Sequence, residues 1–146
     1  MRVTPLQMAM VSATIANGGE RMAPYLVAAV RSPDLTVVDE RTPTSLGRSI
    51  STTTATALRD MMVEVVADGT GTSAQISGVT VAGKSGTAET TEEAAPHAWF
   101  TAFAPAENPR IAVAVIVENG GSAGSEATGG RVAAPIARAV IEAALR

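Results

Sequence analysis

The strongest candidate for chemistry in this 146-residue sequence is Gly83-Lys84-Ser85-Gly86-Thr87, called here the Lys84 box. It combines the only lysine of the chain with two hydroxyls and two glycines. An ammonium group and neighbouring hydroxyls are hydrogen-bond donors that suit a carboxylate. On an edge strand, free backbone amides can also pair with an extended peptide. The box therefore predicts a receptor for a carboxylate and for a peptide backbone.

The residues before the box favour a strand. From residue 79 to residue 82, valine alternates with smaller residues, a period typical of a strand with one buried face. Continued alternation places Lys84 and Gly86 on one face. It places Ser85 and Thr87 on the other. Glycine inside a strand often marks the close approach of a ligand or another backbone, and a side chain at position 86 would obstruct the space before the ammonium. The structural alternative is a solvated strand end that runs into a turn.

Composition bounds the possible functions. The chain is 46% hydrophobic but only 3% aromatic, so a core must be built from aliphatic residues. A net charge of −3 without a basic cluster argues against nucleic acid as a partner. No apolar run reaches the roughly 18 residues of a membrane helix. The absence of cysteine and the single histidine, His97, argue against a metal site, and we expect no cofactor.

Helices are expected in the first half of the chain. Thr4 and Gln7 form a potential capping box around Pro5, and Asn17-Gly18-Gly19 would end that helix. Helical spacing is shown by its apolar residues Leu6, Met10, Ala13 and Ile15 or Ala16. Its small residues would allow close packing on another helix: Ala9, Ser12, Ala13 and Ala16. Ser51 would cap a second helix from Thr52 to Ala67 with an apolar stripe of Leu58, Met61, Met62, Val65 and Val66. Between the helices, a small hairpin is predicted around Ser32-Pro33-Asp34, followed by a loop over 43–47.

Strands dominate the second half. We expect strands over 97–103 and 111–117, which form an antiparallel meander with the strand of the Lys84 box. Residues 89–96, including Glu92 and Glu93, are interpreted as a solvated turn, and the glycine-rich segment 120–130 as a linker. A final helix from about Val132 to Leu145 would cover the sheet with Ile136, Val140, Ala143 and Ala144. The predicted class is α+β, with N-terminal helices, a three-strand antiparallel meander and a C-terminal covering helix.

The Lys84 box resembles the K-[TS]-G-T motif that penicillin-binding proteins and serine β-lactamases carry on a strand of the catalytic sheet. Further segments resemble class B, high-molecular-weight penicillin-binding proteins in order and spacing, over nearly the whole chain. They are Val3-Thr4-Pro5-Leu6-Gln7-Met8-Ala9, Ala16-Asn17-Gly18-Gly19, Val65-Val66 with Gly69-Thr70-Gly71, Ala98-Trp99-Phe100 and Phe103-Ala104-Pro105. The resemblance implies a partial penicillin-binding-protein or serine β-lactamase-like fold.

Two other motifs of the family are missing. The family's nucleophilic serine and its base come from a Ser-x-x-Lys box, and a Ser-x-Asn box supports proton transfer. Lys84, the only lysine, completes no Ser-x-x-Lys, and none of the three asparagines has a serine two positions before it. In the family both motifs lie upstream. The resemblance therefore implies that residues 1–146 are the C-terminal portion of a transpeptidase domain, inactive alone.

The resemblance also implies a function for the parent protein. It would cross-link peptidoglycan stem peptides as a serine-type D,D-transpeptidase, bind β-lactams at the same serine, and be membrane-anchored at the extracytoplasmic face of the bacterial cell membrane. Lys84 would hold the substrate carboxylate region, and the Ser85 and Thr87 hydroxyls would bind the carboxylate. The Thr87 N–H would be an oxyanion donor, and Gly86 would keep the cleft clear. Serine at position 85, where threonine is commoner, retains the hydroxyl.

Two other interpretations remain open from the sequence. The chain could be a non-catalytic binding or assembly module that uses the same sheet, or a self-contained hydrolase with His97 as its base. We also expect self-association of the isolated chain. Its basis is the uncharged segment 111–117. The family resemblance implies that a strand from the upstream part of the domain pairs with this segment, which would otherwise form an exposed sheet edge.

Overall fold

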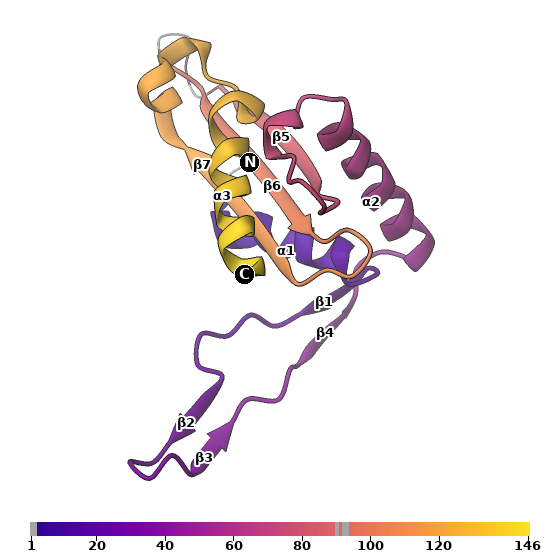
Figure 1. Cartoon of the computed structure of the whole chain (residues 1–146), viewed down its shortest axis with the longest axis vertical. Coiled ribbons are helices and arrows are strands. Elements are labelled where there is room, and N and C mark those ends of the chain that lie inside the picture. The colour runs from indigo at the N-terminus through magenta and orange to yellow at the C-terminus, as the bar shows by residue number, and fades with distance from the viewer. Residues whose placement is uncertain (1–2, 90, 92–93) are drawn as a thin grey trace.

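The structure is a computed structural model that describes residues 3–89, 91 and 94–146. A three-stranded sheet lies at the centre, helices cover both of its faces, and a long two-stranded arm projects from one end (Figure 1). The element order confirms the predicted α+β class, and Glu92 and Glu93 of the predicted acidic turn lie outside the described residues. No helix among the described residues has both the length and the apolar character needed to cross a bilayer.

The central sheet is an antiparallel meander of β5 (Ala82–Ala88), β6 (His97–Ala104) and β7 (Ile111–Val117). The strand order β5-β6-β7 confirms the predicted meander. Within the described residues, β5 and β7 each pair with one strand only, so both present an open edge.

The strand of the Lys84 box is shorter than predicted at its start. β5 begins at Ala82, whereas the valine alternation begins at Val79. Gly78 has a φ of +76°, and the tight turn there pairs Val79 with Ile76 in an isolated bridge. Val79, the first valine of the alternation, therefore belongs to a turn that glycine permits and not to the strand.

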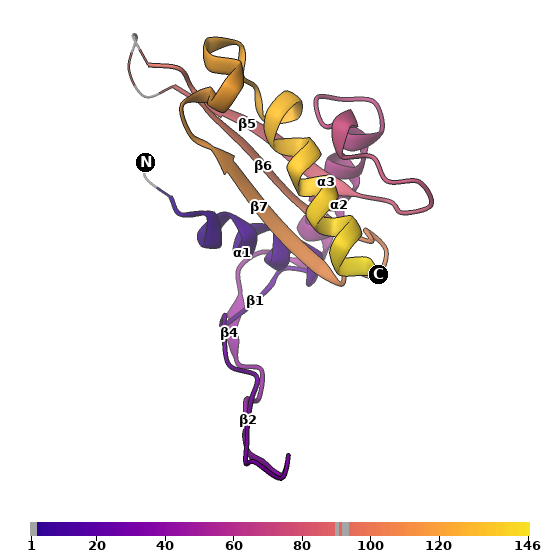
Figure 2. The ribbon, with the colours of Figure 1, turned by 60° about the vertical axis from the view of Figure 1, so that its left-hand side comes forward.

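Helix α1 (Pro5–Ala16) lies against one face of the sheet, over β6 and β7 (Figure 2). Its predicted capping box is present. Thr4 Oγ1 accepts the Gln7 N–H at 3.2 Å, and Gln7 Oε1 accepts the Thr4 N–H at 2.8 Å. The helix ends at the predicted glycines, Gly18 and Gly19, both with positive φ.

The predicted apolar residues of α1 are buried only in part: Ile15 and Ala16 pack against the core, and Met10 is half-buried. Leu6 is 58% exposed and Ala13 is also exposed, whereas Ser12 is fully buried against the sheet. A serine can occupy this position because its hydroxyl bonds Thr101 of β6, and because a short side chain allows the helix to lie close to the strands.

Helix α2 (Thr52–Ala67) packs beside β5 and starts at the predicted cap, where Ser51 Oγ accepts the Thr54 N–H at 3.0 Å. Met62 is buried, as the predicted stripe requires. Met61 is 57% exposed, so the buried stripe is narrower than predicted.

The glycine-rich segment is a set of defined turns, and its interpretation as a linker is wrong. Residues Glu118–Glu126 form 3₁₀ turns (η2), and residues Gly129–Ala133 form a π-helical turn (η3) that leads into α3 (Ala134–Leu145). Both Gly129 and Gly120 are buried. The glycines therefore allow close backbone packing here.

Helix α3 covers the face of the sheet opposite α1 (Figure 2), but with a different side from the one predicted. Ile136 and Val140 are 46% and 42% exposed, whereas Ala137 and Ile141 are fully buried. The small alanines fit against Phe100, the bulky ring that β6 presents on this face. The buried side of α3 therefore combines small alanines, which leave room for the Phe100 ring, with the large aliphatic Ile141.

The arm consists of two short antiparallel ribbons in series. β1 (Glu20–Met22) pairs with β4 (Ser45–Arg48), and further out β2 (Ala29–Arg31) pairs with β3 (Val37–Glu40). The outer ribbon confirms the predicted hairpin. The predicted loop over 43–47 is wrong, because the inner ribbon includes most of it.

Candidate functional site

The Lys84 box lies on β5, and the strand register fixes which face each side chain occupies. Lys84 is opposite Thr101, Ser85 is opposite Phe100, and Gly86 is opposite Trp99 on β6. Directly opposed residues of an antiparallel pair share a face. Lys84 therefore lies on the α1 face with Thr101, and Ser85 lies on the α3 face with Phe100, which confirms the predicted alternation.

A cavity of about 270 Å³ adjoins the box on the α1 face. It is called here the Lys84 cavity. Its wall is formed by residues 84–88, Trp99, Phe100, Thr101, Val3 and Met8. A Cβ at Gly86 would come within 3.4 Å of the Trp99 Cβ, so glycine at this position leaves room beside the tryptophan. This geometry is consistent with the space-keeping role predicted for Gly86.

The Lys84 ammonium is available to an anionic ligand. The side chain is exposed, and its Nζ donates a hydrogen bond to the Ser85 carbonyl at 2.7 Å. No carboxylate among the described residues forms an ion pair with it. The positive charge next to the cavity is thus not neutralised by any part of the chain that the structure describes.

The backbone of β5 adds donors and acceptors at the open edge of the sheet. We infer that the Ser85 carbonyl faces this edge, because the exposed Lys84 Nζ donates to it. Residues two apart on a strand present their backbone groups to the same side. We therefore infer that Thr87 presents its N–H at the same edge, which is the location that its predicted role as an oxyanion donor requires.

One hydroxyl contact reaches the box itself and another reaches its neighbouring strand β6, and the sequence did not predict either of them. On the α3 face, Ser85 Oγ and Thr70 Oγ1 are 2.7 Å apart. On the α1 face, Ser12 Oγ lies 2.6 Å from Thr101 Oγ1, which in turn donates to the Val113 carbonyl at 3.1 Å. The only sequence signal for the first contact was the segment around Thr70 in the family resemblance.

Neither His97 nor a group of metal-binding side chains provides a second site among the residues that the structure describes. His97 Nδ1 accepts the Asn119 N–H at 2.9 Å, so this nitrogen is engaged by the backbone and is not free to act as a base. In the part of the chain that the structure describes, no three potential ligand side chains gather in a way that could hold a metal ion.

The chain resembles known proteins over nearly its whole length. The family model of the penicillin-binding protein transpeptidase domain matches residues 1–142. The peptidoglycan D,D-transpeptidase PbpA of Mycolicibacterium smegmatis is 50% identical over 149 residues, which cover 99% of this chain and 30% of that protein. The PbpA of Mycobacterium tuberculosis is 49% identical over the same length.

Solved structures agree as well. Penicillin-binding protein A of M. tuberculosis, as a ceftriaxone acyl-enzyme complex, matches with a TM-score of 0.91 and 46% identity over 99% of this chain and 33% of that chain. The D,D-transpeptidase domain of an Eggerthella lenta peptidoglycan glycosyltransferase matches with a TM-score of 0.80 and 40% identity over 97% of this chain and 32% of that chain. This chain therefore spans about a third of the length of these proteins.

Proposed function

Because this chain belongs to the penicillin-binding protein transpeptidase family, we propose that it supplies the carboxylate-binding wall of a D,D-transpeptidase site in a longer parent protein. Residues 1–146 would be the C-terminal portion of the transpeptidase domain. The parent would cross-link peptidoglycan stem peptides and would react with β-lactams. The observation that carries the proposal is the single lysine, not ion-paired within the described residues, beside a cavity at the open edge of β5.

Each part of the Lys84 box has a role in this proposal. Lys84 attracts the carboxylate region of the stem peptide or β-lactam, and the hydroxyls of Ser85 and Thr87 donate hydrogen bonds to the carboxylate. The Thr87 N–H stabilises the negative charge that develops on the attacked carbonyl oxygen. Gly86 leaves the approach open. An extended stem peptide would pair with the free backbone groups of β5.

The nucleophilic serine, its lysine base and the Ser-x-Asn motif are proposed to come from another part of the parent. The isolated 146 residues are therefore proposed to be inactive. By the same reasoning, the parent acts at the extracytoplasmic face of the bacterial membrane, to which it is anchored, because its peptidoglycan substrate lies there. No cofactor takes part, since acyl transfer through serine needs only side chains and backbone donors.

Lys84→Ala in the parent tests the proposal directly. The substitution should lower the rate constant of acylation by a fluorescent penicillin about 10- to 100-fold, because a hydrogen bond to a charged group contributes roughly 1.5–3 kcal/mol. Stopped labelling reactions resolved on a gel give the rate constant, and circular dichroism checks the fold.

The matched control is Arg110→Ala, which removes an exposed cation next to β7, at the opposite edge of the sheet from β5, and should leave labelling unchanged. A Lys84→Ala effect below about threefold would remove Lys84 from the site. A covalent penicilloyl adduct on the isolated 146-residue chain, detected by intact mass, would contradict the proposal that the nucleophile lies elsewhere.

A further inference from the structure

Thr70 approaches the Lys84 box from the face opposite the Lys84 cavity. Its Oγ1 lies 2.7 Å from Ser85 Oγ, although the two residues are separated by 15 positions in sequence. Thr70 belongs to the loop that follows α2, and this loop has no other part in the proposed chemistry. The contact between the two hydroxyls therefore needs an explanation.

The loop of Thr70 is fixed on both sides of the threonine. The N–H groups of Gly69 and Gly71 both donate to the Val65 carbonyl, at 3.2 and 2.9 Å. A Cβ at Gly71 would lie 3.2 Å from the Phe100 ring, so the loop backbone rests closely on the residue opposite Ser85. These contacts define where the Thr70 side chain can be.

The π-helical turn η3 closes the loop from the other side. A Cβ at Gly130 would lie only 1.9 Å from the Thr70 carbonyl oxygen. A Cβ at Gly129 would lie 2.0 Å from the Trp99 carbonyl oxygen and 2.8 Å from the Gly86 nitrogen. Backbone atoms cannot move aside as a flexible side chain can. Only glycine at positions 129 and 130 therefore allows η3 to lie directly against the Thr70 loop and the strand of the Lys84 box.

We propose that Thr70 is a positioning residue that orients the Ser85 hydroxyl toward a carboxylate bound at the open edge of β5, where Lys84 Nζ approaches from the other face of the strand. Each hydroxyl has one proton to donate. If Thr70 Oγ1 donates to Ser85 Oγ, the Ser85 proton is free for the carboxylate, which accepts only. The proposal rests on the proposed carboxylate-binding function of the box, and Thr70 itself does not touch the ligand.

The test is a double-mutant cycle in the parent protein, measured as the rate constant of acylation by a fluorescent penicillin. Thr70→Val keeps the shape of the side chain and removes the hydroxyl, and it should lower the rate constant roughly 3- to 10-fold. In a Ser85→Ala background the same substitution should change it by less than about twofold, because the group that Thr70 orients is gone.

Two further variants separate positioning from general stability. Thr70→Ser restores a hydroxyl and should return the rate constant to within about twofold of the unaltered parent. Thr72→Val removes an exposed hydroxyl from the same stretch of chain and should leave labelling unchanged.

The inference is wrong if Thr70→Val has no effect, or if its effect is equally large with and without Ser85. Either result would leave the proposed function intact as long as Lys84→Ala blocks labelling. An unaltered parent that takes up no penicillin would instead overturn the proposed function, and the role of Thr70 with it.

Discussion

Ser12 is fully buried and polar, and its position depends on one side chain 89 residues away. Its Oγ lies 2.6 Å from Thr101 Oγ1. We infer that Ser12 donates, because the single Thr101 proton can go to the Val113 carbonyl at 3.1 Å or to the Met8 carbonyl at 3.3 Å. This chain of hydrogen bonds joins α1 to the sheet at Thr101, directly opposite Lys84. Thr101, which holds α1 to the sheet, is thus also the cross-strand neighbour of Lys84.

Thr101→Val should destabilise the protein by about 1–3 kcal/mol, because it leaves the buried Ser12 hydroxyl without an acceptor. Adding Ser12→Ala should recover part of this loss, since removing both polar partners is less costly than removing one. Urea denaturation of the two single variants and the double variant measures the free energies. A double variant as unstable as the sum of the singles would show that the two hydroxyls do not interact.

At the scale of elements, patterns with a local cause were predictable and patterns with a distant cause were not. The cap of α1 at Thr4 depends on residues three positions apart. The strands β6 and β7 depend on alternation and on an unbroken apolar run, respectively, within seven or eight residues. The buried sides of α1 and α3 depend on Thr101 and Phe100, which lie far away in sequence. A prediction from hydrophobicity within each helix therefore placed Leu6 and Ile136 on the buried side, whereas both side chains are exposed.

The same distinction holds for the site. The alternation of Lys84 and Ser85 across β5 followed from the strand itself. The contact of Thr70 with Ser85 could not be predicted, because it requires α2, its following loop and η3 to be assembled first. The segment 120–130 was misinterpreted for a related reason: a glycine that permits close packing and a glycine in a free linker are identical in sequence.

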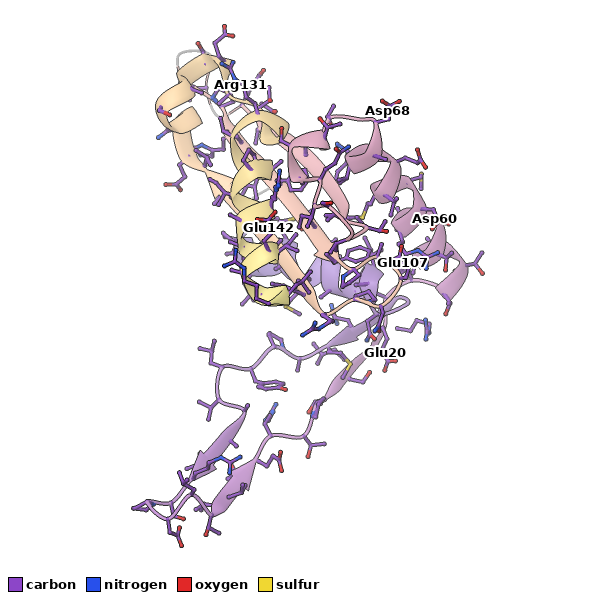
Figure 3. The ribbon with its side chains drawn as sticks, viewed as in Figure 1. Glu20, Asp60, Asp68, Glu107, Arg131 and Glu142 are labelled. Atoms are coloured by element: carbon purple, nitrogen blue, oxygen red, sulfur yellow. The ribbon has the colours of Figure 1, made fainter. Side chains whose placement is uncertain are left out.

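The turn between β6 and β7 contains a carboxyl group with an altered pKa. Glu107 lies beside the part of α2 that carries Asp60 (Figure 3), and the Thr80 hydroxyl holds the pKa of Glu107 below its usual range, with a smaller contribution from the charge of Arg59. The ionised carboxylate therefore favours the folded state at neutral pH. This contribution is present above the ordinary pKa that Glu107 has in the unfolded chain, and it is lost as the pH falls through the lower folded pKa.

Thr80→Val should raise the pKa of Glu107 toward its ordinary value, because the main hydrogen bond to the carboxylate is removed. Carboxyl-carbon NMR across an acid titration measures this change. Asp34 is the internal control: its pKa is lowered chiefly by Ser32 at the tip of the arm and should not respond. An unchanged Glu107 titration would exclude Thr80 as the cause.

At the scale of the whole molecule, the sheet has an uncovered edge. β7 (Ile111–Val117) carries no charge and no proline, and its seven residues are all half-buried between α1 and α3. Its outer backbone groups have no strand partner within the described residues. An edge of this kind can pair with another chain.

We therefore expect the isolated 146-residue chain to form dimers or larger assemblies through β7. Light scattering over a concentration series measures the mass, and hydrogen exchange should show protection of residues 111–117 that increases with concentration. Val38→Lys, which places a charge among the exposed apolar residues of the arm, should leave the assembly unchanged. A stable monomer at high concentration with protected amides along 111–117 would contradict the prediction, since the strand would then be covered within one chain.

The base of the arm is narrow. The Gly19 carbonyl accepts the N–H of Ser49 at 2.8 Å, so the chain leaves the body and returns to it at almost the same point (Figure 1). Almost everything between these residues is solvent-exposed. The arm is thus a cassette inserted between α1 and α2: its length and sequence could vary, or a short turn could replace it, without any change in the packing that holds the Lys84 box.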